Sequence, residues 1–308
     1  MIGAGPSALS AAIYTTREDI DTVLLEKGVV GGLAAITDQV DNYPGFEDGV
    51  TGLALAEKLE KQAERFGADI RYGEVTTIEG NPKDHIVTVS TTDGIYSAKA
   101  VLIATGSDWK KIGVPGEEEY FGRGVHYCAT CDGAFYRDKR LVVVGGGNSA
   151  VQEALFLTRF TTHIDLLVRS TIKASEVLQH ELKKAVHEGK ITVHLGAVTN
   201  EIVGEDNMVK KVIATQNGKK KEYKVDGVFV FVGLLPNTQF LKDTKIQLDE
   251  TGFIKTDDSL MTAIPGVFAS GDVRSGATMQ IASAVGEGAT AALKIREYLE
   301  GRKAHPTA

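Results

Sequence analysis

The run Leu141-Val142-Val143-Val144-Gly145-Gly146-Gly147-Asn148-Ser149-Ala150 is an apolar strand pattern that ends in a glycine-rich turn. A second copy of this turn, Gly3-Ala4-Gly5-Pro6-Ser7-Ala8, stands at the start of the chain. Both copies match G-x-G-x-x-A, the turn that joins the first strand of a dinucleotide-binding unit to its helix. The sequence therefore predicts two such units. Only Met1 and Ile2 precede Gly3, so the first strand is expected to be short or to begin before the recorded start.

Each unit is expected to continue in the same order, with a helix, a second strand, a hairpin and a closing apolar strand. In the first half these are strand 22–26, a hairpin that turns at Asp93-Gly94, and run 100–106; in the second, strand 163–168, a turn at Asn217-Gly218, and run 227–232. The expected fold class is α/β, with two Rossmann-like dinucleotide-binding domains, the second inserted into the first, and a β-meander in each. The predicted bounds are 1–112 and 239–308 for the outer domain and 113–238 for the inserted one.

Composition narrows the classes of function. The chain has 308 residues, of which 43% are hydrophobic and 24% charged, as is ordinary for a globular protein. Its net charge of -7 argues against a nucleic-acid partner, which would require a basic face. No apolar stretch approaches the roughly 18 residues that span a bilayer, so no membrane partner is expected. Two cysteines are few for a secreted protein held together by disulfides, which favours a cytoplasmic location.

The first glycine turn is expected to bind the pyrophosphate of a dinucleotide. Gly3 and Gly5 let the backbone approach the phosphates, and Pro6 fixes the turn without donating a hydrogen bond. The helix that begins near Ser7 then directs its N-terminus at the phosphates. Glu26 follows about 20 residues later at a strand end, where a carboxylate binds ribose hydroxyls.

The second turn is expected to bind a second dinucleotide through Gly145, Gly147, Asn148, Ser149 and Ala150. Arg169 and Lys173 follow the next strand, and no acidic residue stands at its end. This pattern favours the 2′-phosphate of NADPH over NADH. A solvated surface role for Lys173 is the alternative, and NADH therefore stays open.

The only two cysteines, Cys128 and Cys131, lie between the two turns. A structural zinc site would need further ligands, and only His126 is nearby. An inert buried pair would make the C-x-x-C spacing a coincidence, so a redox-active pair is favoured. A helix start at this point would keep the sulfurs close and stabilise a thiolate. Asp132 directly follows, either as a proton donor or as a helix-capping residue.

Near the C-terminus, the apolar run 266–270 ends in Gly271-Asp272. A carboxylate at this strand end can bind a ribityl hydroxyl. The helix expected from about Met279 would direct its N-terminus at a flavin carbonyl.

Together these motifs resemble the low-molecular-weight thioredoxin reductases of bacteria, and the resemblance covers almost the whole chain. It implies FAD in the outer domain, NADPH or NADH in the inserted domain, a thioredoxin or thioredoxin-like partner, and a homodimer. It also implies that Cys131 faces the flavin, that Cys128 attacks the partner disulfide, and that Asp132 is the acid. Besides the two turns, Cys128 to Gly133 and Gly271-Asp272, its marks are Asp41-Asn42-Tyr43-Pro44-Gly45-Phe46, Ala104-Thr105-Gly106 and Val114-Pro115-Gly116-Glu117.

The same resemblance implies further flavin-binding positions, which are Gly32, Leu33, Asn42, Ala104, Thr105, Gly106, Gln280, Ile281 and Ala282. The chain departs from the family at three places. Leu33 replaces a usual Gln, and Met279 replaces a usual Arg. A usual His-Arg-Arg with a later Arg falls on Leu167-Val168-Arg169 and Lys173. These departures keep open a dithiol oxidase, a ferredoxin-linked reductase and a flavin-binding redox sensor.

Overall fold

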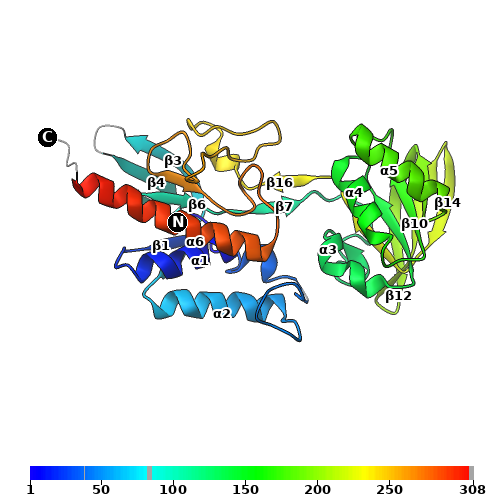
Figure 1. The fold of residues 1–308 in the computed structure, drawn as a ribbon, viewed down its shortest axis with the longest axis horizontal. Helices are drawn as coiled ribbons and strands as arrows, with labels where there is room; N and C mark the ends of the chain where they lie inside the picture. The colour runs from blue at the N-terminus through cyan, green and yellow to red at the C-terminus, as the bar shows by residue number, and fades with distance from the viewer. Residues whose placement is uncertain (38, 82–84, 305–308) are drawn as a thin grey trace. The chain divides into compact units, whose positions relative to one another are not determined.

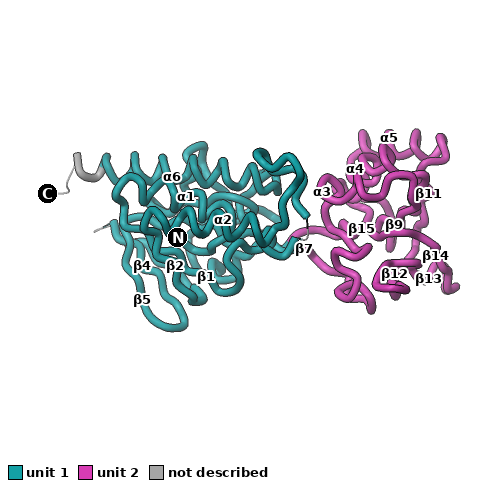
Figure 2. The backbone as a smooth tube through the Cα atoms, turned by 90° about the horizontal axis from the view of Figure 1, so that it is seen from below, with its two compact units in different colours: residues 1–108, 235–308 teal, residues 109–234 magenta. Residues whose placement is uncertain are grey.

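The computed structural model describes residues 1–37, 39–81 and 85–304, and the chain divides into two units (Figure 2). Unit 1 comprises residues 1–108 and 235–308, and unit 2 comprises Trp109–Leu234. The chain passes between them through two paired strands, β7 (Ser107–Trp109) and β16 (Leu234–Pro236). The divisions at 108/109 and 234/235 lie four residues before the predicted boundaries at 112/113 and 238/239.

Side-chain contacts explain where the divisions fall. The indole ring of Trp109 stacks on Tyr127 with ring centroids 5.2 Å apart, which ties Trp109 to unit 2. Asn237 instead joins unit 1, because its side-chain amide donates to the backbone oxygen of Thr105 at 3.0 Å. The Thr105 hydroxyl donates to the backbone oxygen of Asn237 at 2.8 Å in return.

Unit 1 is built on a parallel sheet in which β2 (Asp69–Tyr72) pairs with β1 (Val23–Glu26), and β6 (Val101–Ile103) pairs with β17 (Val267–Ala269). Ile2 forms bridges to Leu25 and to Ile103 and so joins the two pairs. The expected first strand is therefore reduced to a single bridging residue. The remaining elements are α1 (Pro6–Thr16), η1 (Gly32–Ala34), α2 (Gly52–Arg65), η3 (Gln239–Leu241), α6 (Ile281–Ala304), and an antiparallel meander of β3 (Val75–Asn81), β4 (Ile86–Thr91) and β5 (Ile95–Ala98).

Alternate side chains of this sheet pack on opposite layers, as strand geometry dictates. Leu24 and Leu102 face a core shared with α1, α2 and α6. Leu25 and Ile103 face a second core, shared with the meander residues Ile78, Val87 and Val89. In Figure 1, α1 and α6 lie side by side, and their contact is close because a Cβ on Gly288 would collide with the backbone oxygen of Ser7.

Unit 2 repeats this plan with a five-stranded parallel sheet in the order β11-β10-β9-β15-β8. These strands are β8 (Val125–His126), β9 (Arg140–Val144), β10 (His163–Val168), β11 (Ile191–Leu195) and β15 (Gly227–Val230). The helices are α3 (Ala129–Asp132), η2 (Gly133–Tyr136), α4 (Asn148–Leu157) and α5 (Glu176–His187), and the meander is β12 (Ala197–Glu205), β13 (Met208–Gln216) and β14 (Lys219–Lys224).

The alternation along β9 shows the layers of unit 2. Leu141 and Val143 pack with residues of α4 and α5, whereas Val142 and Val144 pack against the meander. All four side chains are buried, which explains why this strand is apolar on both faces. The two units therefore share one three-layer design, in agreement with the predicted fold class.

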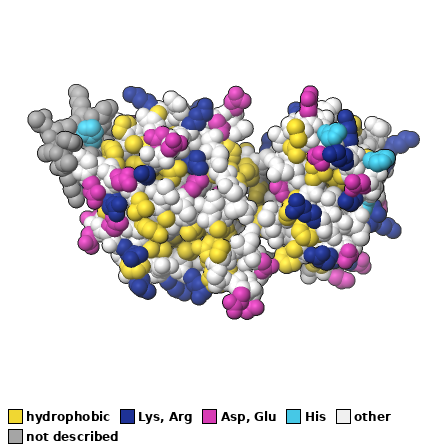
Figure 3. Space-filling model, in the orientation of Figure 1, with side chains coloured by type: hydrophobic (Ala, Val, Ile, Leu, Met, Phe, Trp, Pro, Cys, Tyr) yellow, Lys and Arg dark blue, Asp and Glu magenta, His cyan; other side chains and the backbone are white. Residues whose placement is uncertain are grey.

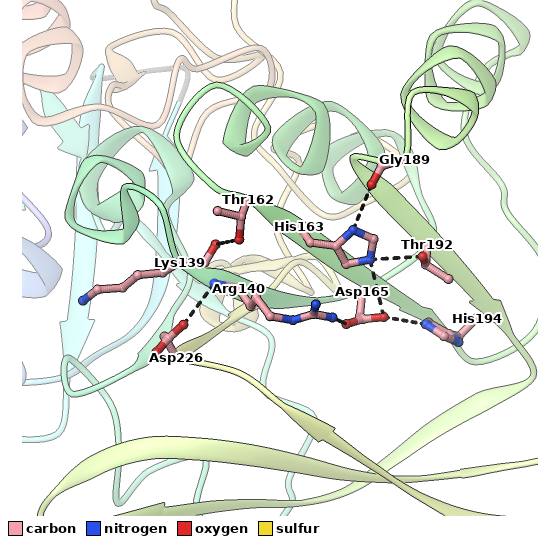
Figure 4. Close-up of polar contacts among 9 residues, drawn as sticks. All are labelled: Lys139, Arg140, Thr162, His163, Asp165, Gly189, Thr192, His194 and Asp226. Atoms are coloured by element: carbon pink, nitrogen blue, oxygen red, sulfur yellow. Dashed lines mark hydrogen bonds and ion pairs between the residues drawn. The ribbon is translucent and has the colours of Figure 1, made fainter.

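One polar cluster lies on this sheet around Asp165, which is level with Val142 in the middle of β9 (Figure 4). Asp165 is only 8% exposed, and its carboxylate accepts a hydrogen bond from His194 Nε2 at 2.8 Å. Arg140 Nη2 approaches the second carboxylate oxygen at 3.3 Å. On the molecular face shown in Figure 3, acidic and basic side chains are interspersed over both units.

Candidate active site

The first glycine turn leaves the N-terminus of α1 open. Gly3 has φ +96°, and a Cβ there would lie 2.6 Å from the backbone oxygen of Ala104, so only glycine fits. Gly5 precedes α1, whose first position is Pro6, and no described side chain caps the helix. A Cβ on Gly5 would meet no atom within 4 Å. The free N–H groups and the space before them suit a pyrophosphate.

The second glycine turn repeats this geometry in unit 2. Gly145 has φ +145°, and a Cβ there would collide with the backbone oxygen of Phe231 and lie 2.7 Å from Ala150. Gly147 precedes α4, again without a side-chain cap among the described residues, and a Cβ on it would meet no atom within 4 Å. Asn148 and Ser149 begin the helix. The two turns are therefore alike in sequence and also in the open space in front of their helices.

The segment after β10 folds back along the second turn. The Lys173 N–H donates to the backbone oxygen of Gly146 at 2.7 Å. The Ser175 N–H donates to Asn148 Oδ1 at 2.8 Å. The structure therefore brings Arg169 and Lys173, whose side chains are exposed, beside the turn that starts α4. This placement is compatible with a phosphate contact, which stays a prediction.

Glu26 lies at the end of β1 and holds the first turn in shape. Its carboxylate accepts hydrogen bonds from the N–H groups of Ala4 and Gly28, each at 2.7 Å. A cavity within unit 1 is lined by Glu26 together with Gly3, Thr105 and Asn237. The structure thus brings the predicted ribose ligand Glu26 and one of the predicted residues after β6, Thr105, to one cavity.

Asp272 follows β17 and is largely buried. Burial, and then the negative charge of Glu287, raises the pKa of this carboxyl to about 6 from 3.8. Among the described residues no hydrogen bond reaches its carboxylate, whereas the Glu287 carboxylate accepts from Gly271 N–H at 2.8 Å and pairs with Arg274 at 2.6 Å. A buried carboxylate without a donor suits a ligand hydroxyl. The predicted Ser7 hydroxyl, in contrast, is bonded to Ser270 at 2.7 Å.

The start of α6 carries the remaining predicted flavin positions. Asn42 Nδ2 donates to Gln280 Oε1 at 3.1 Å, so the structure joins two residues that are 238 positions apart. Met279 adopts φ +57°, a left-handed conformation that is uncommon outside glycine. Ile281 is the first residue of the helix, and Ala282 follows. Leu33 lies in η1 directly after Gly32, whose φ is +56°.

Cys128 and Cys131 form a disulfide, with Cα atoms 5.3 Å apart. Cys128 is the N-cap of α3, and the N–H of Cys131 donates to Cys128 Sγ at 3.2 Å. Because α3 is a single turn of four residues, its dipole is small, and this direct N–H contact is the clearer stabilisation of a sulfur anion. Within the described residues, no three His, Cys, Asp or Glu side chains are arranged to hold a metal ion.

Asp132 pairs with a residue that the sequence did not assign to this role. Asp132 Oδ2 lies 3.2 Å from His126 Nδ1, and the other ring nitrogen of His126 is 2.7 Å from the Tyr136 hydroxyl. The helix-capping alternative for Asp132 is not observed, because its side chain makes no capping hydrogen bond to η2. From the sequence, His126 is a candidate only for a zinc ligand. The neighbouring residues Val125 and Tyr127 are the one sequence feature that indicates burial of His126.

A flavin dinucleotide fits the residues of unit 1. The open helix start at Gly5 suits its pyrophosphate, Glu26 lines a cavity at the ribose position, and the unpartnered Asp272 carboxylate suits a ribityl hydroxyl. The second open helix start, at Gly147 in unit 2, suits a nicotinamide dinucleotide. Among the described helices, none is both long and apolar enough to span a membrane.

Comparison with known proteins gives consistent matches over the whole chain. The sequence profile of the pyridine nucleotide-disulphide oxidoreductases matches residues 1–288. The thioredoxin reductase of Bacillus subtilis (strain 168) is 40% identical over 303 residues, which cover 97% of this chain and 94% of that protein. The thioredoxin reductase of Treponema pallidum is 39% identical over 302 residues, covering 97% and 96%. The crystal structure of thioredoxin reductase from Streptococcus pyogenes superposes with a TM-score of 0.90 at 42% identity and covers 97% of both chains.

Proposed function

This chain belongs to the pyridine nucleotide-disulphide oxidoreductase family, and we propose from this premise that it is an NADPH-dependent thioredoxin reductase containing FAD. The observation that carries the proposal is the Cys128–Cys131 disulfide, which lies in the same unit as one of two open dinucleotide turns. Identity of about 40% over almost the full chain supports it. A dinucleotide enzyme without thiol chemistry would have no use for this pair.

When bound, the two dinucleotides would supply the redox chemistry, which is hydride donation by NADPH and electron transfer by FAD to a disulfide. Unit 1 binds FAD through Gly3, Gly5 and Pro6 at the start of α1, with Glu26 on the ribose and Asp272 on the ribityl chain. Unit 2 binds NADPH at the start of α4, and Arg169 and Lys173 recognise its 2′-phosphate. The remaining proposed FAD contacts are Ser7, Gly32, Leu33, Asn42, Ala104, Thr105, Gly106, Gly271, Gln280, Ile281 and Ala282, and the remaining NADPH contacts are Gly145, Gly147, Asn148, Ser149 and Ala150.

The cysteines carry the electrons to the partner. Cys131 accepts them within the enzyme, which converts the Cys128–Cys131 disulfide to a dithiol. Cys128 then attacks the partner disulfide as a thiolate, because the thiolate is the nucleophilic form. Asp132 supplies a proton at this step. The N–H of Cys131, 3.2 Å from Cys128 Sγ, favours the anionic sulfur.

The partner is thioredoxin or a thioredoxin-like protein, and the enzyme acts as a homodimer in the cytoplasm. The sparse cysteine content supports the cytoplasmic location, because secreted proteins held together by disulfides are richer in cysteine. The family resemblance supports the dimer. Light scattering after size-exclusion chromatography measures the assembly directly, and a mass near the 32.9 kDa of one chain would overturn the dimer.

The decisive experiment is anaerobic mixing of the FAD-loaded protein with stoichiometric NADPH or NADH, followed by the reduction of added thioredoxin. We expect NADPH to bleach the flavin rapidly and thioredoxin to be reduced. Preference for NADH would correct the cofactor and leave the enzyme class unchanged. Bleaching by neither would overturn the proposal and favour a ferredoxin-linked reductase, a dithiol oxidase or a redox sensor.

Cys131→Ser tests the thiol assignment separately. The variant should still bind FAD and be bleached by NADPH, because the nucleotide sites are untouched. It should not reduce thioredoxin, because no disulfide can form with Cys128. Retained turnover would remove the cysteines from the mechanism.

A further inference from the structure

His126 lies against the residue that the proposed function uses as an acid. Its Nδ1 atom is 3.2 Å from Asp132 Oδ2, and Asp132 directly follows Cys131 in the chain. The two residues come from different elements, because His126 ends β8 and Asp132 ends α3. The Asp132 side chain keeps 20% of its surface exposed, whereas that of His126 keeps only 9%. The histidine therefore lies on the protein side of the carboxylate.

The surroundings of His126 fix its ring. The ring stacks on Phe229 with centroids 5.1 Å apart, and Tyr136 packs edge-on at 5.3 Å. Its Nε2 atom is 2.7 Å from the Tyr136 hydroxyl. With the hydroxyl donating to Nε2, the Nδ1 atom carries hydrogen and donates to Asp132. Both ring nitrogens thus have polar partners, and these contacts hold the ring in its orientation toward Asp132.

Few charged groups act on this cluster. Burial, and then the charges of Asp132 and Asp226, raises the pKa of Tyr136, so its hydroxyl stays neutral at physiological pH. The Lys139 ammonium lies 5.4 Å from the centroid of the Tyr136 ring. Among the described residues, Tyr136, Lys139 and Asp226 are thus the titratable groups that act on the pair or on its hydroxyl partner, and Cys131 precedes Asp132 in the chain. Of the two polar contacts that the His126 ring makes, with Asp132 and with Tyr136, the contact with Asp132 leads to the residue next to Cys131 in the chain.

We propose that His126 and Asp132 act as one proton-holding pair beside the Cys128–Cys131 dithiol. His126 is the positioning residue: it holds the Asp132 carboxylate in place and shares its proton. This inference rests on the proposed function, because it assigns the source of the proton in that reaction. Because the His126 ring and the Asp132 carboxylate lie 3.2 Å apart, loss of either member should change how the reactivity of the dithiol depends on pH.

The proton balance of the reaction can be written with this pair. The Cys128 thiolate forms a bond to one partner sulfur, the partner disulfide breaks, and the departing thiolate takes the proton of the pair. Cys131 then gives its own proton to the pair, and its sulfur displaces the second partner sulfur from Cys128. That sulfur leaves as a thiolate and takes the proton from the pair. The enzyme dithiol is oxidised to a disulfide, the partner disulfide is reduced to a dithiol, and the pair ends deprotonated.

Two amide substitutions separate the two sides of the ring. In His126→Asn the amide nitrogen replaces Nδ1 and can still donate to Asp132, but it cannot titrate. In His126→Gln the amide reaches the Nε2 position, next to Tyr136, and leaves Asp132 without its donor. His187→Asn, which changes an exposed histidine of α5, is the matched control. Asp132→Asn removes the other member of the pair and provides a second route to the same test.

The readout is the rate at which iodoacetamide alkylates the dithiol between pH 5 and 9, in full-chain protein reduced with dithiothreitol. We expect the dependence of the alkylation rate on pH to be the same in His187→Asn as in the unmodified protein, and to be altered in His126→Asn, His126→Gln and Asp132→Asn. Thioredoxin reduction should fall by about tenfold more in His126→Gln than in His126→Asn, because only asparagine keeps Asp132 in position. An unchanged dependence of the alkylation rate on pH in the His126 and Asp132 variants would overturn the proposal. Because alkylation uses neither nucleotide nor thioredoxin, a failure of the proposed function would be seen separately.

Discussion

Asp272→Asn should stabilise the FAD-free protein and weaken its binding of FAD. Burial raises the pKa of Asp272 from 3.8 to about 6, so the folded protein favours the neutral acid. The stabilisation associated with that acid is complete below pH 4 and is lost as the pH rises through about 6. A difference of about 2 pKa units corresponds to about 3 kcal/mol of unfolding free energy at neutral pH. Asparagine carries no charge, so the variant avoids this loss.

Urea unfolding of the FAD-free protein at pH 4 and pH 7.5 measures the effect. At pH 7.5 the variant should be more stable than the unmodified protein by about 2 to 3 kcal/mol, and at pH 4 the two should agree within about 1 kcal/mol. Asp258→Asn, an exposed aspartate of the same unit, should change neither value.

Binding of FAD should move in the opposite direction. A hydrogen bond to a charged acceptor contributes about 1.5 to 3 kcal/mol, so the dissociation constant should rise by tenfold or more. A variant that is no more stable at pH 7.5 would refute the argument from burial. A variant that binds FAD as tightly as before would refute the assignment of Asp272 to the flavin.

Three further predictions concern unit 2. Gly147→Ala should change the unfolding free energy by no more than about 0.5 kcal/mol, because the new Cβ enters the open space before α4. The same Cβ should slow flavin bleaching by NADPH. Gly145→Ala should destabilise the fold, because its Cβ would collide with the backbone of Phe231. Equal stability of these two variants in urea would contradict this. Glu117→Gln should lower the unfolding free energy by about 2 to 4 kcal/mol. The reason is that the Glu117 carboxylate is only 1% exposed and accepts hydrogen bonds from the N–H groups of Ile112 and Gly113 and from the Tyr127 hydroxyl. Urea unfolding, followed by the fluorescence of the only tryptophan, measures this change. An unchanged midpoint would show that these donors find other partners. Asp165→Asn should cost about 1 to 3 kcal/mol through the loss of its contacts with His194 and Arg140 (Figure 4). The KM for NADPH should stay unchanged, because these contacts do not include the glycine turn, and a raised KM would show coupling between Asp165 and that turn.

The fold could be predicted well from the sequence because its signals are local. The strand expected at 163–168 is β10, His163–Val168, and the apolar alternation of β9 serves two cores at once. The glycine turns are equally local. Gly3 and Gly145 are required by their positive φ angles and close backbone contacts, whereas Gly5 and Gly147 leave open space before their helices. The boundaries between the units were less accurate, because they depend on tertiary contacts such as the stacking of Trp109 on Tyr127.

The site was predicted in part, and the omissions share one cause. Asp132 was identified from its place after Cys131, but its partner His126 could not be recognised before the short strand β8 and the turn α3 were placed together. Glu117 appeared only as part of a family motif, although it is a buried acceptor for three donors. Each role depends on which side chains meet across elements, and residue spacing does not determine that.

The pairing of β7 with β16 has a consequence for how the chain could have been assembled. Residues 109–234 enter and leave through neighbouring strands, so the two junctions are about one strand spacing, 4.8 Å, apart. A short peptide across this gap would make the outer unit continuous, and the inserted unit has its own sheet and cores. Recombination at this point exchanges a whole redox module without altering the strands around it, which makes the junction a natural place to build chimaeric reductases.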